Sequence, residues 1–450
     1  MMTIDSEYVC SCNSTTPTFF TYSIYTTELT NSSSTYTPFG NVMRTTSNPV
    51  IPDDISELPM SREEGQQLYD SLAPWFEAQG YSLYPRDLDN PTSKLLPGNL
   101  GAEMTSEIGN PPRFPYAHVV GRGPTRRAFE VLCTIFPAVN REDQDVVIKL
   151  ISNEGFELEI CQHLMTEAAR RDKLNMTIPI LDTLPFSENW SFIVMPRWGS
   201  TSGLQRWGFN DIRTAFHYMS SVLKSLVFLH QNLIVHRDIR PDNILINCIT
   251  NRVVTDLRPF LDSGHAKFAL CDFGLSFKFP PDTPLEERLR PSIDCCIGTL
   301  EYQPPDGTDG EAFYDPFAFD VACLGGVFCE LVGHLTTLVN PLAPFLDRMV
   351  THDISARYTA EEALRALTQL EAQLSPECLT TRVMRPPVGP LAKEYCPWQA
   401  YNRWSDLPLS FIAQHPAPPS SMKSKSYDDD WKPYFDVYTL EASFLKLFAA

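Results

Sequence analysis

The sequence of 450 residues lacks long hydrophobic runs, and none approaches the roughly 18 apolar residues that a membrane-spanning helix needs. Its beginning, MMTIDSEYVCSCNSTT, carries acidic residues early and has no basic start followed by an apolar stretch. A secretory signal shows the opposite pattern. These absences predict an intracellular protein, cytoplasmic or nuclear, without a membrane partner.

Paired cysteine motifs are also absent. The 12 cysteines are scattered, and the only close neighbours are Cys10 with Cys12 and Cys295 with Cys296. A zinc site shows as regularly spaced pairs, and structural disulfides form in oxidising compartments. We therefore expect reduced thiols and neither a zinc site nor a disulfide framework.

Positive charge is scarce. The chain has 36 Lys and Arg against 55 Asp and Glu, a formal net charge of −19. Nucleic acids and anionic membranes attract basic surfaces, so this balance argues against both as partners. It is compatible with basic protein substrates and equally with a solvated acidic surface. The sequence does not determine the oligomeric state.

What is present is enough apolar sequence, 43 % of residues, for a sizeable core. Strand patterns precede helix patterns, which predicts an α+β fold with a small β-rich lobe, a larger helical lobe and a cleft suited to a nucleotide. The expected divisions are a disordered Ser/Thr-rich arm (1–60), a helical extension (61–115), the small lobe (116–196), the large lobe (197–374) and a Pro/aromatic-rich tail (375–450).

The most informative segment is the octet His-Arg-Asp-Ile-Arg-Pro-Asp-Asn at 236–243. Pro241 cannot continue a helix, so Asp238 and Asn243 must lie on a loop. Phosphoryl transfer needs a carboxylate to accept or orient the proton of the attacking hydroxyl, and an oxygen ligand for magnesium. Asp238 and Asn243 suit these two roles, whereas an ordinary polar turn is the alternative interpretation.

A second carboxylate, Asp272, follows the apolar run 268–270 and precedes Phe273 and Gly274. A carboxylate at a strand end, followed by a flexible glycine, can hold a metal that bridges two phosphates. Alone, this tripeptide is usually a turn. Because it follows the octet here, it becomes a specific indication of a metal-binding carboxylate.

Lys149 ends the β-branched run Val146-Val147-Ile148, where its ammonium could contact phosphates if a carboxylate positioned it. We expect Glu157 to be that carboxylate. Three apolar residues, Ile160, Cys161 and Leu164, follow it on the same helical face, from which Glu159 points away. The alternative is a surface lysine at a strand end.

In this order, the motifs resemble those of the eukaryotic protein kinase family over roughly residues 116–370, within an expected kinase domain of 116–374. The resemblance implies ATP and Mg²⁺ as cofactors and a protein substrate. It assigns catalysis to Asp238, Arg240, Lys149 and Glu157, and the metal to Asn243 and Asp272. It assigns the nucleotide to Gly121, Gly123, Val147, Lys149, Met195, Arg197 and Leu245.

Later segments also match the family. Residues 298–306 resemble its substrate-binding loop, and Arg357 resembles the arginine that pairs with the final acid of that loop, here Asp306. Asp320 and Gly325 resemble the Asp-x-x-x-x-Gly of its central buried helix.

The sequence departs from the family pattern at several places, among them a span from Asp320 to Arg357 that is shorter than usual. The phosphate loop keeps Gly121 and Gly123, but Arg126 stands where a third glycine belongs and Pro124 removes a backbone donor. Arg240 replaces the usual lysine and retains its positive charge. Residues 247–266 are an expected insertion.

In the family that the motifs resemble, the arginine at the position of Arg237 usually pairs with a phosphate on the activation segment, which here lies between Asp272 and Asp306. The acceptor position falls on Cys295, which has no hydroxyl group. We hypothesise that Asp294 supplies the negative charge, with Ser292 as the competing candidate.

Three functions fit these motifs. The first is an active serine/threonine kinase, a specificity that Thr299 favours. The second is a pseudokinase that acts as a nucleotide-binding or scaffold module, consistent with the altered phosphate loop. The third is a small-molecule phosphotransferase, against which the segment 298–306 argues.

Overall fold

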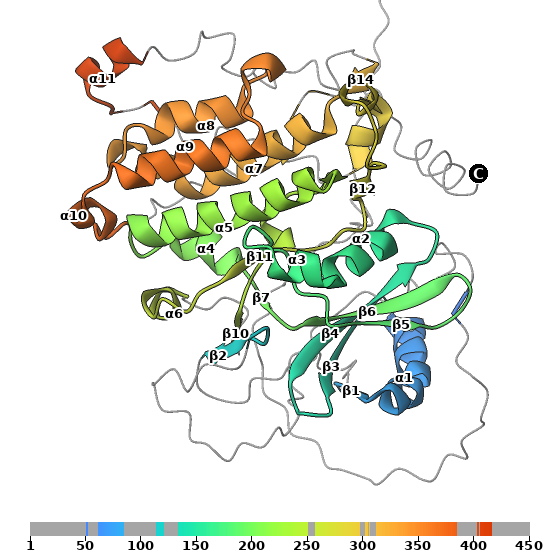
Figure 1. The fold of residues 1–450 in the computed structure, drawn as a ribbon. Helices are drawn as coiled ribbons and strands as arrows, with labels where there is room; N and C mark the ends of the chain where they lie inside the picture. The colour runs from blue at the N-terminus through green and yellow to red at the C-terminus, as the bar shows by residue number, and fades with distance from the viewer. Residues whose placement is uncertain are drawn as a thin grey trace, which may run out of the picture.

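In the computed structural model the chain folds into a sheet-rich small lobe and a helical large lobe, which confirms the expected α+β class (Figure 1). The structure describes residues 51–52, 62–84, 114–120, 134–250, 257–297, 302–304, 306, 312–384, 403–404 and 406–415. Nearly all of the predicted arm and most of the predicted tail lie outside these residues.

The small lobe is built on a five-stranded antiparallel sheet with the order β1-β3-β4-β6-β5. Its strands are β1 (Tyr81–Leu83), β3 (Ile135–Asn140), β4 (Asp145–Ser152), β6 (Trp190–Pro196) and β5 (Asp182–Pro185). Helix α1 (Arg62–Gln79) covers one face, where its Phe76 packs on Phe136 and Phe192. Helix α2 (Phe156–Met165) lies against the other face, followed by α3 (Glu167–Arg171).

The predicted start of the small lobe at residue 116 is wrong. Helix α1 and β1 belong to its core, because β1 pairs with β3 in the register Tyr81 to Asn140. Strand β2 (His118–Val120), which lies within the range expected for the small lobe, is not part of this sheet and pairs in parallel with β10 (Cys248–Thr250). An alternating pattern marks a strand but does not identify its partner.

The large lobe centres on two buried helices, α5 (Ile212–Gln231) and α7 (Pro316–Val332). Helices α8 (Leu342–Val350) and α9 (Ala360–Ala372) pack against them. Its shorter helices are α4 (Ser202–Trp207), α6 (Arg258–Asp262), α10 (Pro376–Leu379) and α11 (Leu409–Gln414).

Helix α7 and the turn after it form one stretch, Pro316–Thr337, that is long and apolar enough to cross a membrane by composition. It is the one such stretch among the described residues, and it corrects the expectation that the sequence has none. Within the structure, 83 % of its most apolar window is buried. Its apolar side chains thus form the core of the large lobe.

Short strands flank the loops of residues 199–314. They are β7 (Gly199–Ser200), β8 (Ile234–Val235), β9 (Ile244–Ile246), β11 (Phe268–Leu270), β12 (Phe277–Lys278), β13 (Arg290–Pro291) and β14 (Phe313–Tyr314). Strand β9 lies between β11 and β7, β12 pairs with β8, and β13 pairs with β14. The octet and Asp272 therefore sit on loops that adjoining strands hold in place.

The described part of the tail contacts the large lobe. Arg403 forms an ion pair with Asp347 of α8 at 2.5 Å, and the indole of Trp404 donates to the same carboxylate at 2.6 Å. These contacts hold Arg403 and Trp404 against α8.

Candidate active site

Lys149 lies on β4, paired with β3 on one side and β6 on the other. Val146 and Ile148 alternate with it and are fully buried against α1, so strand periodicity turns Lys149 to the opposite face. Its ammonium lies 2.6 Å from Glu157 Oε1 and 2.8 Å from Asp272 Oδ1. The three charged groups that the sequence analysis singled out therefore meet.

Helix α2 presents Glu157 to Lys149 because Ile160, Cys161 and Leu164 are buried on the same side. Glu159 points away, as predicted. It forms an ion pair at 2.8 Å with Lys278 of β12. The prediction that Glu157, and not Glu159, is the carboxylate beside Lys149 is thus confirmed.

The ion pairs favour the charged forms of Lys149 and Asp272, whereas burial raises the pKa of Glu157 above its ordinary value. Burial by itself would lower the pKa of Lys149, but the carboxylates of Asp272 and Glu157 outweigh burial and hold this pKa above its ordinary value. Burial opposes ionisation of Asp272 as well, yet the neighbouring ammonium holds the pKa of Asp272 below its ordinary value. The site therefore presents an ammonium and a carboxylate at neutral pH.

The octet forms a tight loop held by hydrogen bonds. Pro241 opens a 3₁₀ turn, Pro241–Asn243, that ends the loop and leads into β9. The amide Nδ2 of Asn243 donates to the backbone oxygen and to Oδ2 of Asp238, both at 2.8 Å. The side chains of Asp238 and Asn243 therefore lie together, and the Asn243 amide orients the carboxylate.

The loop rests on the buried carboxylate of Asp320 in α7. Its two oxygens accept hydrogen bonds from the backbone N–H groups of His236 and Arg237, each at 2.7 Å. Arg237 has a φ of 69°, a left-handed conformation that a non-glycine residue adopts only where the surroundings impose it. Asp320 supplies that constraint, which gives a physical reason for the acid at this position.

Asp272 has a similar conformation, with a φ of 68°. The N–H of Gly274 donates to Asp272 Oδ1 at 3.2 Å. A Cβ at Gly274 would lie 3.3 Å from that oxygen and 3.4 Å from Lys149 Nζ, so a side chain there would crowd the ion pair. The glycine thus leaves space for the ion pair.

The two loops are joined directly. The N–H of Cys271 donates to the backbone oxygen of Asn243 at 2.9 Å, and His236 Nε2 lies 3.0 Å from the backbone oxygen of Cys271. Asn243 and Asp272 therefore stand side by side. Because Asn243 Nδ2 is engaged by Asp238, its Oδ1 is the atom suited to a cation, as is the 36 % exposed carboxylate of Asp272.

The predicted nucleotide residues are only partly described. Val147 and Met195 face each other across β4 and β6, and Leu245 lies on β9 opposite Ala269. Arg197 has its guanidinium 5.3 Å from the ring centre of Tyr84. Gly121 and Gly123 lie outside the described residues. The nucleotide roles of all these residues stay predictions.

Arg240 is buried and forms an ion pair with Asp242 of the same loop. Its predicted catalytic role required a charge directed at the transferred phosphoryl group. Because Asp242 offsets that charge, we expect a contribution smaller than that of a free lysine.

The hypothesis that the Asp294 carboxylate pairs with Arg237 is wrong. Arg237 Nη2 donates to the backbone oxygen of Asp294 at 2.5 Å, and the carboxylate binds Arg290 at 2.6 Å. Sequence reasoning missed Arg290, which is one of two arginines in that segment, the other being Arg288.

Sequence reasoning also missed the contact between α2 and β12. Besides the ion pair of Glu159 with Lys278, the rings of Phe156 and Phe277 lie 4.4 Å apart. The sequence did indicate that Glu159 lies on the face of α2 away from Glu157, where it could bind another element. Nothing in the sequence identified its partner.

The substrate-loop segment is described only in part. Asp306 forms the predicted ion pair with Arg357, through contacts of 2.5 and 2.9 Å. Residues 298–301 lie outside the described residues.

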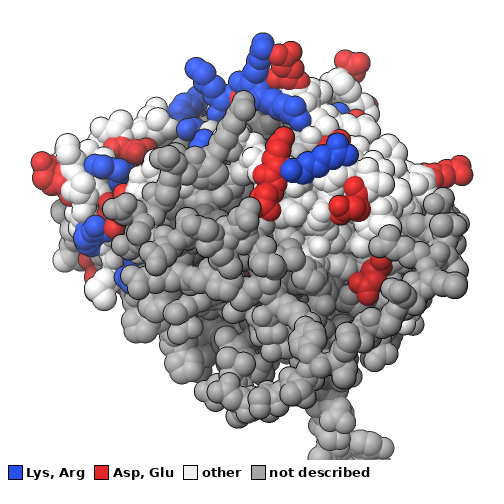
Figure 2. Space-filling model, turned by 90° about the horizontal axis from the view of Figure 1, so that it is seen from below, with Lys and Arg blue, Asp and Glu red and all other residues white. Residues whose placement is uncertain are grey.

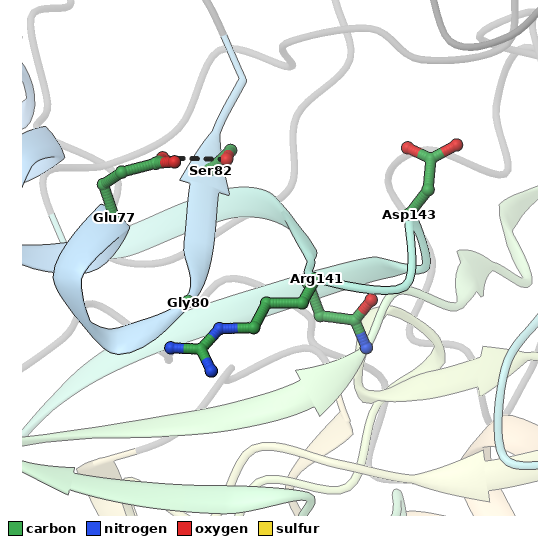
Figure 3. A pocket seen from close by; sticks show the side chains of 6 residues that line it. Glu77, Gly80, Ser82, Arg141 and Asp143 are labelled. Atoms are coloured by element: carbon green, nitrogen blue, oxygen red, sulfur yellow. Dashed lines mark hydrogen bonds between the residues drawn. The ribbon is translucent and has the colours of Figure 1, made fainter.

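A pocket of about 350 Å³ lies elsewhere, where the turn after α1 meets the turn between β3 and β4 (Figure 3). It is lined by Glu77, Gly80, Ser82, Asn140, Arg141 and Asp143. None of these belongs to the site around Lys149, and a hydrogen bond of 2.8 Å already joins Ser82 to Glu77. We assign it no function.

Comparisons with known proteins agree with this geometry. The family model described as protein kinase domain matches residues 131–341. Mitogen-activated protein kinase 20 of Arabidopsis thaliana is 24 % identical over 324 residues, which cover 66 % of this chain and 45 % of that protein.

Two further relatives match shorter parts. Mitogen-activated protein kinase kinase kinase 15 of Mus musculus is 34 % identical over 136 residues, 30 % of this chain and 8 % of that protein. Aurora kinase B of Danio rerio is 35 % identical over 118 residues, 26 % and 29 % of the two chains. The chain spans less than half the length of each of these three relatives. Residues 131–341 are a protein kinase domain of the eukaryotic type.

Proposed function

We propose that this chain is an active protein kinase that transfers the γ-phosphoryl group of ATP to serine or threonine hydroxyls of a protein. One observation carries the proposal: the Lys149 ammonium lies between Glu157 and Asp272, beside the loop that holds Asp238 and Asn243. A scaffold that binds no nucleotide has no need for this set of charges.

Lys149 supplies the positive charge that the α- and β-phosphates of ATP require, and Glu157 fixes its direction. Asn243 and Asp272 would hold Mg²⁺, which neutralises charge on the phosphates when bound. Both present hard oxygen atoms from adjoining loops, as this ion prefers.

Asp238 is the residue that faces the attacking hydroxyl in this proposal. Its carboxylate accepts a hydrogen bond from Asn243 and is thereby held in one orientation. A carboxylate so placed can orient the hydroxyl towards the γ-phosphorus and accept its proton as the new P–O bond forms, while the bond from the γ-phosphorus to the bridging oxygen breaks and ADP leaves.

Relatives named as mitogen-activated and Aurora kinases support serine/threonine specificity at low identity. A protein substrate follows from membership of the family. Figure 2 shows Lys and Arg side chains gathered along one edge of the face seen from below, with Asp and Glu beside them. The described part of that face thus has mixed charge, unlike a surface built for nucleic acid.

The test is transfer of labelled phosphate from ATP to a generic basic protein, with Mg²⁺, by the full chain and by its Asp238→Asn variant. We expect incorporation by the native chain and its loss in the variant. The variant matters because a contaminating kinase would label both samples equally. Equal labelling, or none, combined with Mg²⁺-dependent thermal stabilisation by ATP, would instead support a pseudokinase.

We also predict that activity does not depend on phosphorylation of the activation segment. The Arg290–Asp294 ion pair and the hydrogen bond from Arg237 hold that segment without a phosphate. Asp294→Asn is expected to lower kcat by up to about fivefold, the effect of losing one partly exposed ion pair. Phosphatase treatment of the purified chain is expected to change kcat little, and a complete loss after that treatment would refute the prediction.

A further inference from the structure

Seven residues, Phe114 to Val120, belong to neither the five-stranded sheet nor a helix of the large lobe. They include β2, which lies beside β10 at the junction of the two lobes (Figure 1). We call residues 114–120 the strap. The connection from β1 to β3, which are antiparallel neighbours, runs through it. Such neighbours need only a hairpin of a few residues, so the length of this connection has no role in the sheet itself.

One end of the strap is anchored to the large lobe. His118 to Val120 pair with Cys248 to Thr250, and the N–H of His118 also donates to the backbone oxygen of Asn247 at 2.9 Å. The His118 ring lies 5.1 Å from that of Phe260 in α6. These partners all belong to the segment 247–266, which the sequence analysis identified as an insertion.

The strap also binds the segment that joins the lobes. The indole Nε1 of Trp198 donates to the backbone oxygen of Pro115 at 2.8 Å. Gly199 approaches β10 so closely that a Cβ there would lie 2.1 Å from the backbone oxygen of Cys248. The strap, β10 and the connection between the lobes are therefore packed together.

The other anchor is on the small lobe. The Tyr116 hydroxyl accepts a hydrogen bond from Asn140 Nδ2 at 3.2 Å, at the turn between β3 and β4. The Tyr116 ring packs on the core between the sheet and α1, whereas the next side chain, Ala117, packs on the other core, which runs from the large lobe to α2. Two consecutive residues thus contribute to two separate cores.

We propose that the strap is a tether that holds the two lobes at a set separation and limits how far the cleft between them opens. Lobes joined by a single connection move relative to each other by default. A segment anchored at both ends beside that connection opposes the motion, because opening must break one anchor. This inference concerns the lobes alone and does not depend on whether the chain transfers phosphate.

The test is amide hydrogen exchange of the full chain with one anchor weakened at a time. Tyr116→Phe removes the acceptor for Asn140, and Trp198→Phe removes the donor to Pro115. The amides to follow are those of His118 and of Arg197, which is bonded to the backbone oxygen of Asp145 at 3.0 Å. Loss of one ordinary hydrogen bond changes an opening equilibrium by about fivefold, so each variant is expected to speed exchange of both amides by about that factor.

Tyr81→Phe is the matched control. It also removes a partly buried phenol hydroxyl from the small lobe, on the strand paired with Asn140, but this hydroxyl donates to Asp182 at 3.3 Å and not to the strap. We expect it to leave both amides unchanged. The tether is wrong if Tyr116→Phe speeds exchange only within residues 135–145, or if its effect on His118 and Arg197 equals that of Tyr81→Phe. Trp198→Phe decides the question should the Tyr116 variant fold poorly.

Discussion

Replacing Asp238 by asparagine is expected to lower phosphate transfer by about a thousandfold while leaving the fold intact. Proton transfer by a positioned carboxylate contributes roughly 10² to 10⁴ in rate, and the asparagine amide is no base. The change keeps the shape of the side chain. The backbone oxygen of residue 238 still accepts from Asn243, so the loop is expected to persist.

The measurements are kcat and the KM for ATP, together with the thermal unfolding midpoint. A general base acts on the hydroxyl and not on ATP, so kcat is expected to fall while the KM for ATP stays within about twofold. Asp172→Asn is the control, since it makes the same chemical change at an exposed carboxylate outside the site. Equal kcat values for the two variants would remove Asp238 from the mechanism.

Replacing Arg357 by alanine is expected to destabilise the domain by roughly 3–5 kcal/mol. The side chains of Arg357 and Asp306 are 1 % and 2 % exposed. The guanidinium also donates to the backbone oxygens of Thr351 and Ala318. The variant would leave the Asp306 carboxylate buried without its cation and these acceptors without their donor.

The free energy of unfolding can be measured by urea denaturation, with the dependence on denaturant checked for constancy. Arg382→Ala is the matched control. Its ion pair with Asp262 spans 3.0 Å, but the two side chains are 66 % and 45 % exposed, so its loss is expected to cost at most about 1 kcal/mol. The prediction fails if the two variants lose similar stability. Arg357→Lys should lie between them, because a lysine cannot form the two-pronged contact with Asp306.

Asp238→Asn is expected to lower activity, whereas Arg357→Ala is expected to lower stability, because Asp238 and Asp306 lie in different surroundings. Asp238 is half-buried, and its carboxylate is held by the amide of Asn243 in the candidate active site. Asp306 is buried and fully engaged by Arg357, so its charge serves only the packing of the large lobe. Both belong to motifs that resemble the same family, and motif membership alone does not separate the two roles.

Sequence reasoning was most successful where local pattern decides geometry. The apolar positions of α2 selected Glu157 over Glu159. Pro241 and Asn243 made the octet a loop, as the 3₁₀ turn shows. In each case the side chain's direction follows from its own neighbours in the chain.

Partners far apart in the chain required the tertiary structure. The sequence by itself determined which residues carry charge and which face of a strand or helix they occupy. Only the fold decided that β2 pairs with β10, that Arg290 and not Arg237 binds the Asp294 carboxylate, and that Lys278 meets Glu159. The reason is physical: strand register, helix face and turn type are short-range properties, whereas the choice of partner depends on how all the elements pack at once.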